Sequence, residues 1–129
     1  MKIMAAVTEE KSGPFVIQEL DVGALQPDEI LVEVAAAGIC HTDLIIRDQW
    51  LPVPLPAVLG HEGAGVVSAV GSAVTQIAPG DRVGMTFNSC GHCPTCLQSR
   101  STYCHDFFGR NFASVRPDEI GRASCRERV

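Results

Sequence analysis

Residues 58–70 read VLGHEGAGVVSAV and residues 81–87 read DRVGMTF, and between them Pro79-Gly80 has the composition of a tight turn. Apolar, Val-rich runs bounded by turn residues predict strands, so this stretch predicts two or more of them. Gly63-Ala64-Gly65 hints at a dinucleotide-binding loop, but it lies inside a predicted strand and Ser68 occupies the place of the third glycine. The stretch therefore indicates a sheet that does not belong to a dinucleotide-binding unit.

The residues upstream continue this pattern of short strands. Further strands are predicted at Met1–Thr8, Phe15–Val22 and Glu29–Ala37, where runs rich in Val and Ile end at breaks containing Gly or Pro. After them, Thr42–Gln49 has the apolar spacing of a short helix. Many short strands at such spacing favour a β-barrel or a β-sandwich over a parallel sheet.

Length and composition are those of a single globular domain. The chain has 129 residues, 46% of them hydrophobic and 19% charged, which excludes general disorder. Its formal net charge is −5 and no cluster of Lys or Arg interrupts that acidity, so nucleic-acid binding is not expected. No apolar run approaches the roughly 18 residues of a membrane-spanning helix, and Ile3–Val7 is too short for a signal peptide. We expect a cytoplasmic protein that does not bind membranes.

Four of the six cysteines share a compact spacing, Cys90-x2-Cys93-x2-Cys96-x7-Cys104. Four thiolates at such spacing suit tetrahedral zinc, and a site with four protein ligands would be structural because no position stays open. An iron–sulfur cluster is an alternative, although its fourth cysteine usually comes three residues after the third and precedes proline, whereas His105 follows Cys104. Four unrelated buried thiols are the other alternative.

A second set of ligand-type side chains lies earlier, in Cys40-His41-Thr42-Asp43 and Gly60-His61-Glu62. A cysteine and a histidine with a third ligand and an open position describe a catalytic zinc site. A lone cysteine is more often a small buried hydrophobe, and a lone histidine an ordinary polar residue. Spacing alone therefore leaves this second site open.

The composition changes after Asp118. Ile120–Val129 reads IGRASCRERV, with three arginines in ten residues and no apolar period. We interpret residues 119–129 as the translated end of a sequencing-library adapter, with Glu119 spanning the junction, and assign no role to Cys125. A genuine basic tail is the alternative. On the first interpretation the domain comprises residues 1–118, is cut short at its C-terminal end, and comes from a longer natural protein.

Several motifs together resemble one family. Gly60-His61-Glu62-x2-Gly65-x5-Gly71-x2-Val74 is similar to the signature of zinc-containing alcohol dehydrogenases of the medium-chain dehydrogenase/reductase superfamily. Three further motifs, one before it and two after it, have that family's order and distance: Gly38–Asp43, Pro79–Val83 and the four cysteines. The resemblance implies a mainly β, GroES-like barrel with short helices and a structural-zinc lobe at about residues 88–108. It also implies a Rossmann domain for NAD or NADP, which is missing before residue 118. Tyr103–Phe112 further resembles the aryl (benzyl-type) alcohol dehydrogenases.

The same resemblance implies a role for each matching residue. Around a catalytic zinc, Cys40 and His61 would be ligands and Glu62 the carboxylate that can approach the metal. Thr42 would take the proton from the alcohol, Asp43 would orient the ligand histidine, and His41 would contact the cofactor. The structural zinc would be held by Cys90, Cys93, Cys96 and Cys104. Two features depart from the family pattern: Ile45 stands where some relatives carry a proton-relay histidine, and the third zinc-ligand cysteine does not occur before residue 118.

The expected function is that of the N-terminal part of a zinc-dependent, NAD(P)-linked dehydrogenase that oxidises primary alcohols, including aryl alcohols, to aldehydes by hydride transfer. We expect a homo-oligomeric parent acting on a small-molecule alcohol or aldehyde, and no activity of this chain alone. The chain should hold one zinc tightly at the four cysteines and bind metal weakly or not at all at Cys40 and His61. The alternatives are part of a polyol or glutathione-linked aldehyde dehydrogenase, or a stand-alone, non-enzymatic zinc-binding barrel.

Overall fold

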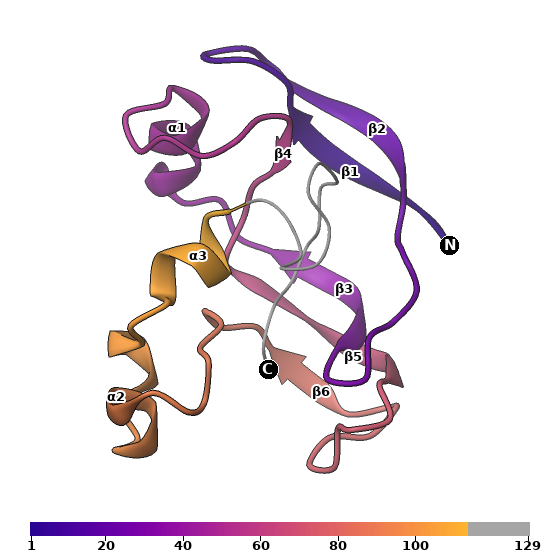
Figure 1. Ribbon diagram of the computed structural model, residues 1–129. Helices are drawn as coiled ribbons and strands as arrows, with labels where there is room; N and C mark the ends of the chain where they lie inside the picture. The colour runs from indigo at the N-terminus through magenta and orange to yellow at the C-terminus, as the bar shows by residue number, and fades with distance from the viewer. Residues whose placement is uncertain (114–129) are drawn as a thin grey trace.

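The computed structural model describes residues 1–113, which contain two antiparallel sheets of three strands each (Figure 1). The first sheet has the strand order β2-β1-β4 and the second has the order β3-β5-β6. The strands are β1 (Lys2–Thr8), β2 (Phe15–Asp21), β3 (Ile30–Ala37), β4 (Ala57–Val58), β5 (Gly63–Val70) and β6 (Arg82–Gly84). The predicted mainly β fold class is confirmed.

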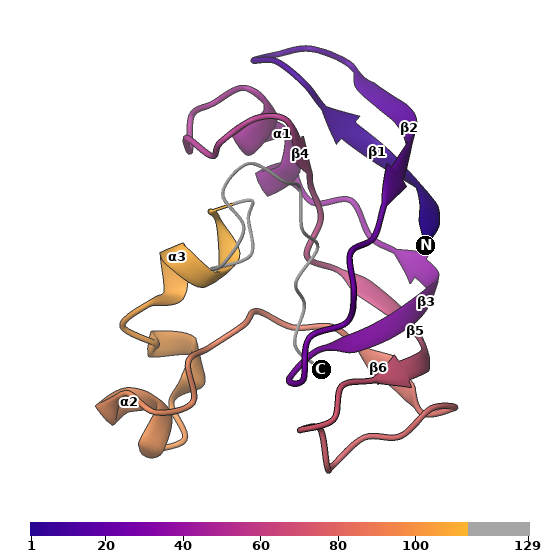
Figure 2. The same ribbon diagram turned by 45° about the vertical axis from the view of Figure 1, so that its right-hand side comes forward.

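Short helical segments complete the described part of the chain: α1 (His41–Arg47), α2 (Pro94–Leu97), η1 (Ser101–Tyr103) and α3 (Phe107–Asn111). In both views the helices lie along one side of the molecule and the two sheets along the other (Figure 1, Figure 2). The predicted helix at Thr42–Gln49 corresponds to α1, which begins one residue earlier and ends at Arg47. Apart from Cys104, the buried apolar side chains of the described residues come from both sheets, α1 and the connection after it: Val7, Ile46, Val53, Ala57 and Val67.

The run at residues 58–70 is divided between the two sheets. β4 ends at Val58, where it pairs with β1, and β5 begins at Gly63, where it pairs with β3. Between them Gly60 has φ of +140°, a backbone conformation that is accessible mainly to glycine. The chain uses this residue to leave one sheet and enter the other. His61 and Glu62 lie in the connection between β4 and β5, so neither residue belongs to a strand of either sheet.

The second sheet requires close approach of two backbones. β3 pairs with β5 from Ile30↔Val70 to Ala37↔Gly63. A Cβ atom at Gly65 would overlap the carbonyl oxygen of Glu33 on the partner strand and lie 2.8 Å from the Val32 side chain. Glycine at this position of the Gly60–Val74 motif therefore has a steric cause, since no larger residue fits between the strands.

The predicted domain end at Asp118 and residues 119–129 lie outside the described part of the chain. Within residues 1–113, no helix has both the length and the apolar character needed to cross a bilayer.

Candidate metal centres

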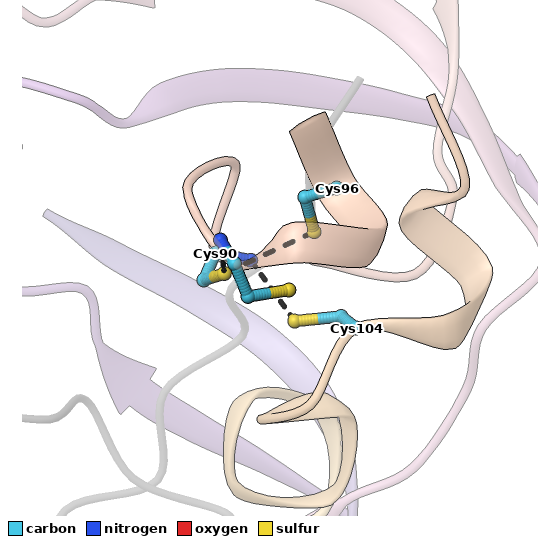
Figure 3. A group of neighbouring side chains, drawn as sticks. Cys90, Cys96 and Cys104 are labelled. Atoms are coloured by element: carbon cyan, nitrogen blue, oxygen red, sulfur yellow. Dashed lines mark hydrogen bonds between the residues drawn. The ribbon is translucent and has the colours of Figure 1, made fainter. Parts of the chain in front are cut away.

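The first candidate centre is the four-cysteine lobe, residues 88–108. Cys90 lies in the loop after β6, Cys93 is the N-cap of α2, Cys96 lies within α2 and Cys104 follows η1. Their sulfur atoms all lie within 4.8 Å of one another, and Figure 3 shows the labelled side chains turned toward a common point. The Cys90 and Cys96 sulfurs are 3.8 Å apart. Tetrahedral zinc with bonds of about 2.3 Å places its sulfurs about 3.8 Å from one another, so the group has the size of such a site.

Backbone amides point at the sulfurs of this group. The Cys93 amide donates to Cys90 Sγ at 3.2 Å, and the Cys90 amide donates to Cys104 Sγ at 3.3 Å. Gly91 makes the turn between the first two cysteines with φ of +77°. Hydrogen bonds to sulfur favour the charged thiolate, which is the form that binds a metal. The loop therefore holds the sulfurs at the spacing of a metal site and also stabilises their charged, ligand form.

Thr95 connects α2 to η1. Its hydroxyl lies 2.8 Å from the carbonyl oxygen of Tyr103 and 3.1 Å from Cys93 Sγ, so it can donate its proton to either atom. The neighbouring histidines are outside the ligand group: His92 is exposed, with Nδ1 2.9 Å from the Cys90 carbonyl oxygen, and His105 is exposed as well. Both histidines therefore lie at the surface of the lobe, outside the group of sulfurs.

The cysteines of the lobe differ in acidity. The hydrogen bond with the Thr95 hydroxyl, aided by the backbone amides of His105 and Cys96, lowers the pKa of the Cys93 thiol to about 5. Burial, together with the nearby sulfurs, raises the pKa of the Cys96 thiol to about 11. The Cys90 amide lowers the pKa of Cys104. At neutral pH the metal-free lobe therefore holds a thiolate at Cys93 and a thiol at Cys96.

Zinc binding to the lobe should release protons at pH 7. Cys96 has a pKa of about 11 and must lose its proton to become a ligand, whereas Cys93, with a pKa of about 5, is already ionised. We expect calorimetric titrations in buffers of different ionisation enthalpy to show at least one proton released per zinc at pH 7. More protons should be released as the pH is lowered through 5, where Cys93 must also be deprotonated, so affinity falls with falling pH. Release of less than half a proton at pH 7 would contradict this assignment.

The second candidate centre is formed by Cys40, His61 and Glu62, whose ligand atoms also lie within 4.8 Å of one another. The register of the second sheet brings them together. Ala37 at the end of β3 pairs with Gly63 at the start of β5, and the Gly38 amide donates to the carbonyl oxygen of Glu62 at 2.7 Å. Gly38 leaves room for the Glu62 side chain, because a Cβ there would lie 2.9 Å from Glu62 Cβ and overlap its carboxylate.

The carboxylate of Asp43 lies between Cys40 and His61 of this second centre. Its Oδ2 accepts the Cys40 amide at 2.9 Å, so the carboxylate is held at the start of α1. Its Oδ1 is buried, has no hydrogen-bond partner among residues 1–113, and lies 3.6 Å from His61 Nδ1. The other ring nitrogen, Nε2, lies 3.8 Å from Glu62 Oε1. A histidine with one nitrogen facing a buried carboxylate and the other facing acidic or thiol groups is the usual arrangement of a metal ligand.

The donor set of the second centre fits zinc, because a thiol, an imidazole and a carboxylate are all zinc ligands. Thr42 joins it, with Oγ1 3.5 Å from Cys40 Sγ and its side chain half-buried. His41 is the first residue of α1 and is exposed. Ile45 is half-buried in the same helix. The structure thus brings five of the six residues predicted for this site into one cluster: Cys40, Thr42, Asp43, His61 and Glu62.

One neighbour of the second centre was not predicted. The ring of Phe87 stacks on the imidazole of His61, with centroids 5.5 Å apart and an interplanar angle of 14°. Phe87 lies between β6 and the four-cysteine lobe and also contacts Phe107 of α3. No motif marks a phenylalanine as a partner of a distant histidine, so this contact becomes visible only in three dimensions.

Comparison with known proteins shows the family of the chain. Residues 26–125 match the family described as alcohol dehydrogenase GroES-like domain. Among proteins of similar sequence, geraniol dehydrogenase of Castellaniella defragrans is 45% identical over 118 residues, which are 92% of this chain and 31% of that protein.

Two crystal structures resemble the model over nearly its whole length. An alcohol dehydrogenase zinc-binding domain protein from Burkholderia ambifaria superimposes with a TM-score of 0.91 at 50% identity, covering 95% of this chain and 33% of the other. Benzyl alcohol dehydrogenase from Acinetobacter calcoaceticus superimposes with a TM-score of 0.90 at 48% identity, covering 95% of this chain and 34% of the other. The chain therefore spans about a third of the length of the relatives it matches.

Proposed function

Since this chain belongs to the alcohol dehydrogenase GroES-like domain family, we propose that it is the part of an NAD(P)-linked alcohol dehydrogenase that holds the catalytic zinc. Membership confirms the family and the fold that the motifs resemble. The observation that carries the proposal is the meeting of Cys40, His61 and Glu62 beside the buried carboxylate of Asp43. Geraniol dehydrogenase and benzyl alcohol dehydrogenase among the relatives support primary alcohols with an unsaturated or aromatic group as the substrates.

The two candidate centres have different parts in this proposal. The four-cysteine lobe holds a structural zinc, because its four ligands leave no position for a substrate. The second centre offers fewer protein ligands and a half-exposed carboxylate, so it has room for a substrate oxygen. We place the end of the domain at Asp118 and assign residues 119–129 no part in it.

The residues of the second centre have distinct tasks. Cys40 Sγ and His61 Nε2 would hold the zinc, with Glu62 close enough to approach it. When bound, zinc acts as a Lewis acid that makes an alcohol hydroxyl more acidic and an aldehyde carbonyl more electrophilic. Asp43 keeps the proton of His61 on Nδ1, which leaves Nε2 free as a ligand.

Thr42 is the proposed proton acceptor for the alcohol. Its Oγ1 lies 3.5 Å from the sulfur of Cys40, and this closeness supports a role toward an alcohol oxygen at the same centre. A threonine hydroxyl can accept one proton while donating its own, so it serves as a relay. Ile45 has no group that could carry the proton onward along α1. The proton would therefore have to leave Thr42 by a route that does not include residue 45.

A chimera tests the proposal. We would join residues 1–118 to the remaining two-thirds of the Acinetobacter benzyl alcohol dehydrogenase, whose N-terminal third this chain resembles. The chimera should oxidise benzyl alcohol with NAD or NADP, while the isolated chain should not. Because a metal Lewis acid lowers the activation barrier by several kcal/mol, Cys40→Ser in the chimera should lower kcat/KM by about a thousandfold or more.

The control keeps the fold and removes only an exposed group. Ser72→Ala, a change at an exposed residue outside both centres, should leave the rate unchanged. A folded chimera that holds its lobe zinc but oxidises neither benzyl alcohol nor geraniol would overturn the proposed function. That result would favour the stand-alone zinc-binding barrel.

A further inference from the structure

We infer that Phe87 is a positioning residue for His61, and that the four-cysteine lobe holds Phe87 in place through Phe107 and Asn111. The inference rests on the proposed function only in taking His61 as a metal ligand. It would give the four-cysteine lobe a second task, the support of the neighbouring centre. Four observations carry it.

The first observation is the constraint on the His61 ring. Asp43 Oδ1 lies 3.6 Å from Nδ1 at the edge of the ring, and Phe87 covers one face at 5.5 Å between centroids. A contact at the edge and a contact on the face restrict different rotations of an imidazole. With the Asp43 contact alone, the ring could still tilt about the line through Nδ1, and Nε2 would move relative to Cys40 and Glu62.

The second observation is the link from Phe87 to the lobe. The Phe87 and Phe107 rings are 5.2 Å apart at an angle of 56°, and Phe112 lies 6.4 Å from Phe87. Phe107 begins α3, and its amide donates to the carbonyl oxygen of Cys104 at 3.1 Å. A metal ligand of the lobe is thus one hydrogen bond and one ring contact away from the phenylalanine that covers His61.

The third observation is a clamp on the residue after Phe87. The Asn88 amide donates to Asn111 Oδ1 at 2.7 Å, and Asn111 Nδ2 donates to the Asn88 carbonyl oxygen at 3.0 Å. Nδ2 also donates to the carbonyl oxygen of Phe107 at 2.7 Å. Asn88 is only 3% exposed, so its backbone groups depend on protein partners. One side chain of α3 therefore holds both the backbone next to Phe87 and the backbone of Phe107.

The fourth observation concerns Phe108, which lies in the same aromatic cluster but makes no ring contact with His61. Phe108 belongs to the same aromatic cluster, with its ring 5.7 Å from Phe107 and 5.4 Å from Phe112. It is 65% exposed, and in residues 1–113 it makes no ring contact with Phe87 or His61. Phe108→Leu is therefore a matched control for Phe87→Leu: the chemical change is the same and the contact with His61 is not involved.

The experiment compares these variants in the full chain with one zinc in the lobe. The first readout is the long-range ¹H–¹⁵N spectrum of His61 at pH 8.5, where an ordinary imidazole is neutral and its tautomer can be assigned. The wild type and Phe108→Leu should show the Nδ1–H form alone, and Phe87→Leu should show both tautomers.

The second readout is the Co²⁺ affinity of the second centre, measured by the visible spectrum of the bound ion. Phe87→Leu should weaken it by roughly three- to tenfold, at or below the usual effect of a residue that orients a ligand. Phe108→Leu should stay within twofold.

A conservative variant at residue 87 and two contrary outcomes complete the test. Phe87→Tyr keeps the ring and should behave as the wild type in both readouts. A single tautomer together with unchanged Co²⁺ affinity in Phe87→Leu would overturn the inference. If Phe87→Leu does not keep its lobe zinc, Asn111→Asp decides, since it cannot donate to the carbonyls of Asn88 and Phe107; an unchanged His61 spectrum then overturns the inference. If Co²⁺ binds the wild-type second centre too weakly to measure, which is the expectation for Cys40 and His61 in this chain alone, the tautomer spectrum decides the role of Phe87 and the chimera decides the proposed function.

Discussion

Cys104→Ser should abolish tight zinc binding by the four-cysteine lobe. Cys104 is buried and its sulfur accepts the Cys90 amide, so the ligand set closes around it. Serine keeps the size, but its hydroxyl stays protonated at neutral pH and is a poor zinc ligand. Even changing a residue that only orients a ligand costs about 10–100-fold in affinity, so loss of a ligand should cost more than about 100-fold. Competition with a chromophoric chelator at pH 7 measures the change.

The fold of the lobe should be lost together with the metal. The lobe has short helices, and within the described residues its buried apolar side chain is Cys104 itself, so zinc binding would supply much of its folding free energy. Hydrogen exchange should show fast exchange of the amides of α2 and η1 in Cys104→Ser and in the wild type after chelation.

Two controls limit the interpretation of that result. Cys40→Ser, outside the lobe, and His92→Ala, beside the ligands, should each keep one zinc per chain. Wild-type zinc affinity in Cys104→Ser would contradict the four-cysteine assignment. Iron with visible absorbance in the purified protein would contradict zinc and support the iron–sulfur alternative.

Each centre could be predicted from the sequence to the extent that its ligands lie close together along the chain. The four-cysteine lobe is set by one loop and three short helical turns, so spacing along the chain was enough to propose it. Cys40 and His61 meet only because β3 and β5 pair with Ala37 opposite Gly63. That register depends on contacts between segments far apart in the sequence, so spacing alone left the second centre open and the resemblance to a family had to supply it.

The strands show the same division. β1, β2 and β3 lie within about a residue of their predicted bounds because each is a local run of apolar residues between breaks. The break between β4 and β5 depends on which sheet each half joins. Gly60 adopts φ of +140° where the chain passes from one sheet to the other, and a glycine within a Val-rich run does not by itself predict such a break. Phe87 and Asn111 could not be found from the sequence for a related reason: their partners are side chains and backbone groups brought near by the fold.

Gly71→Ala should destabilise the fold strongly although it touches neither metal centre. Gly71 is buried, and a Cβ there would overlap the carbonyl oxygens of Gln26 and Pro27 and lie 2.5 Å from the Pro27 carbonyl carbon. The segments cannot move apart freely, because the Gly71 amide donates to Glu29 and the Ala73 amide donates to Pro27, both at 2.8 Å. Relief of the overlap would break these hydrogen bonds. We expect a loss of about 3 kcal/mol in the free energy of unfolding, at the upper end for overpacking.

Gly84→Ala in β6 is the matched control for this change. Its added Cβ would meet no heavy atom within 4 Å, and neither glycine has a positive φ. Alanine also reduces the conformational freedom of the unfolded chain, so Gly84→Ala should be neutral or more stable by about 0.4–1 kcal/mol. Urea unfolding of the zinc-loaded chain measures both variants, and the difference between them isolates the steric effect. Equal stability of the two variants would show that the segment at residues 26–29 can move away from residue 71, and that this glycine of the Gly60–Val74 motif is not there for close packing.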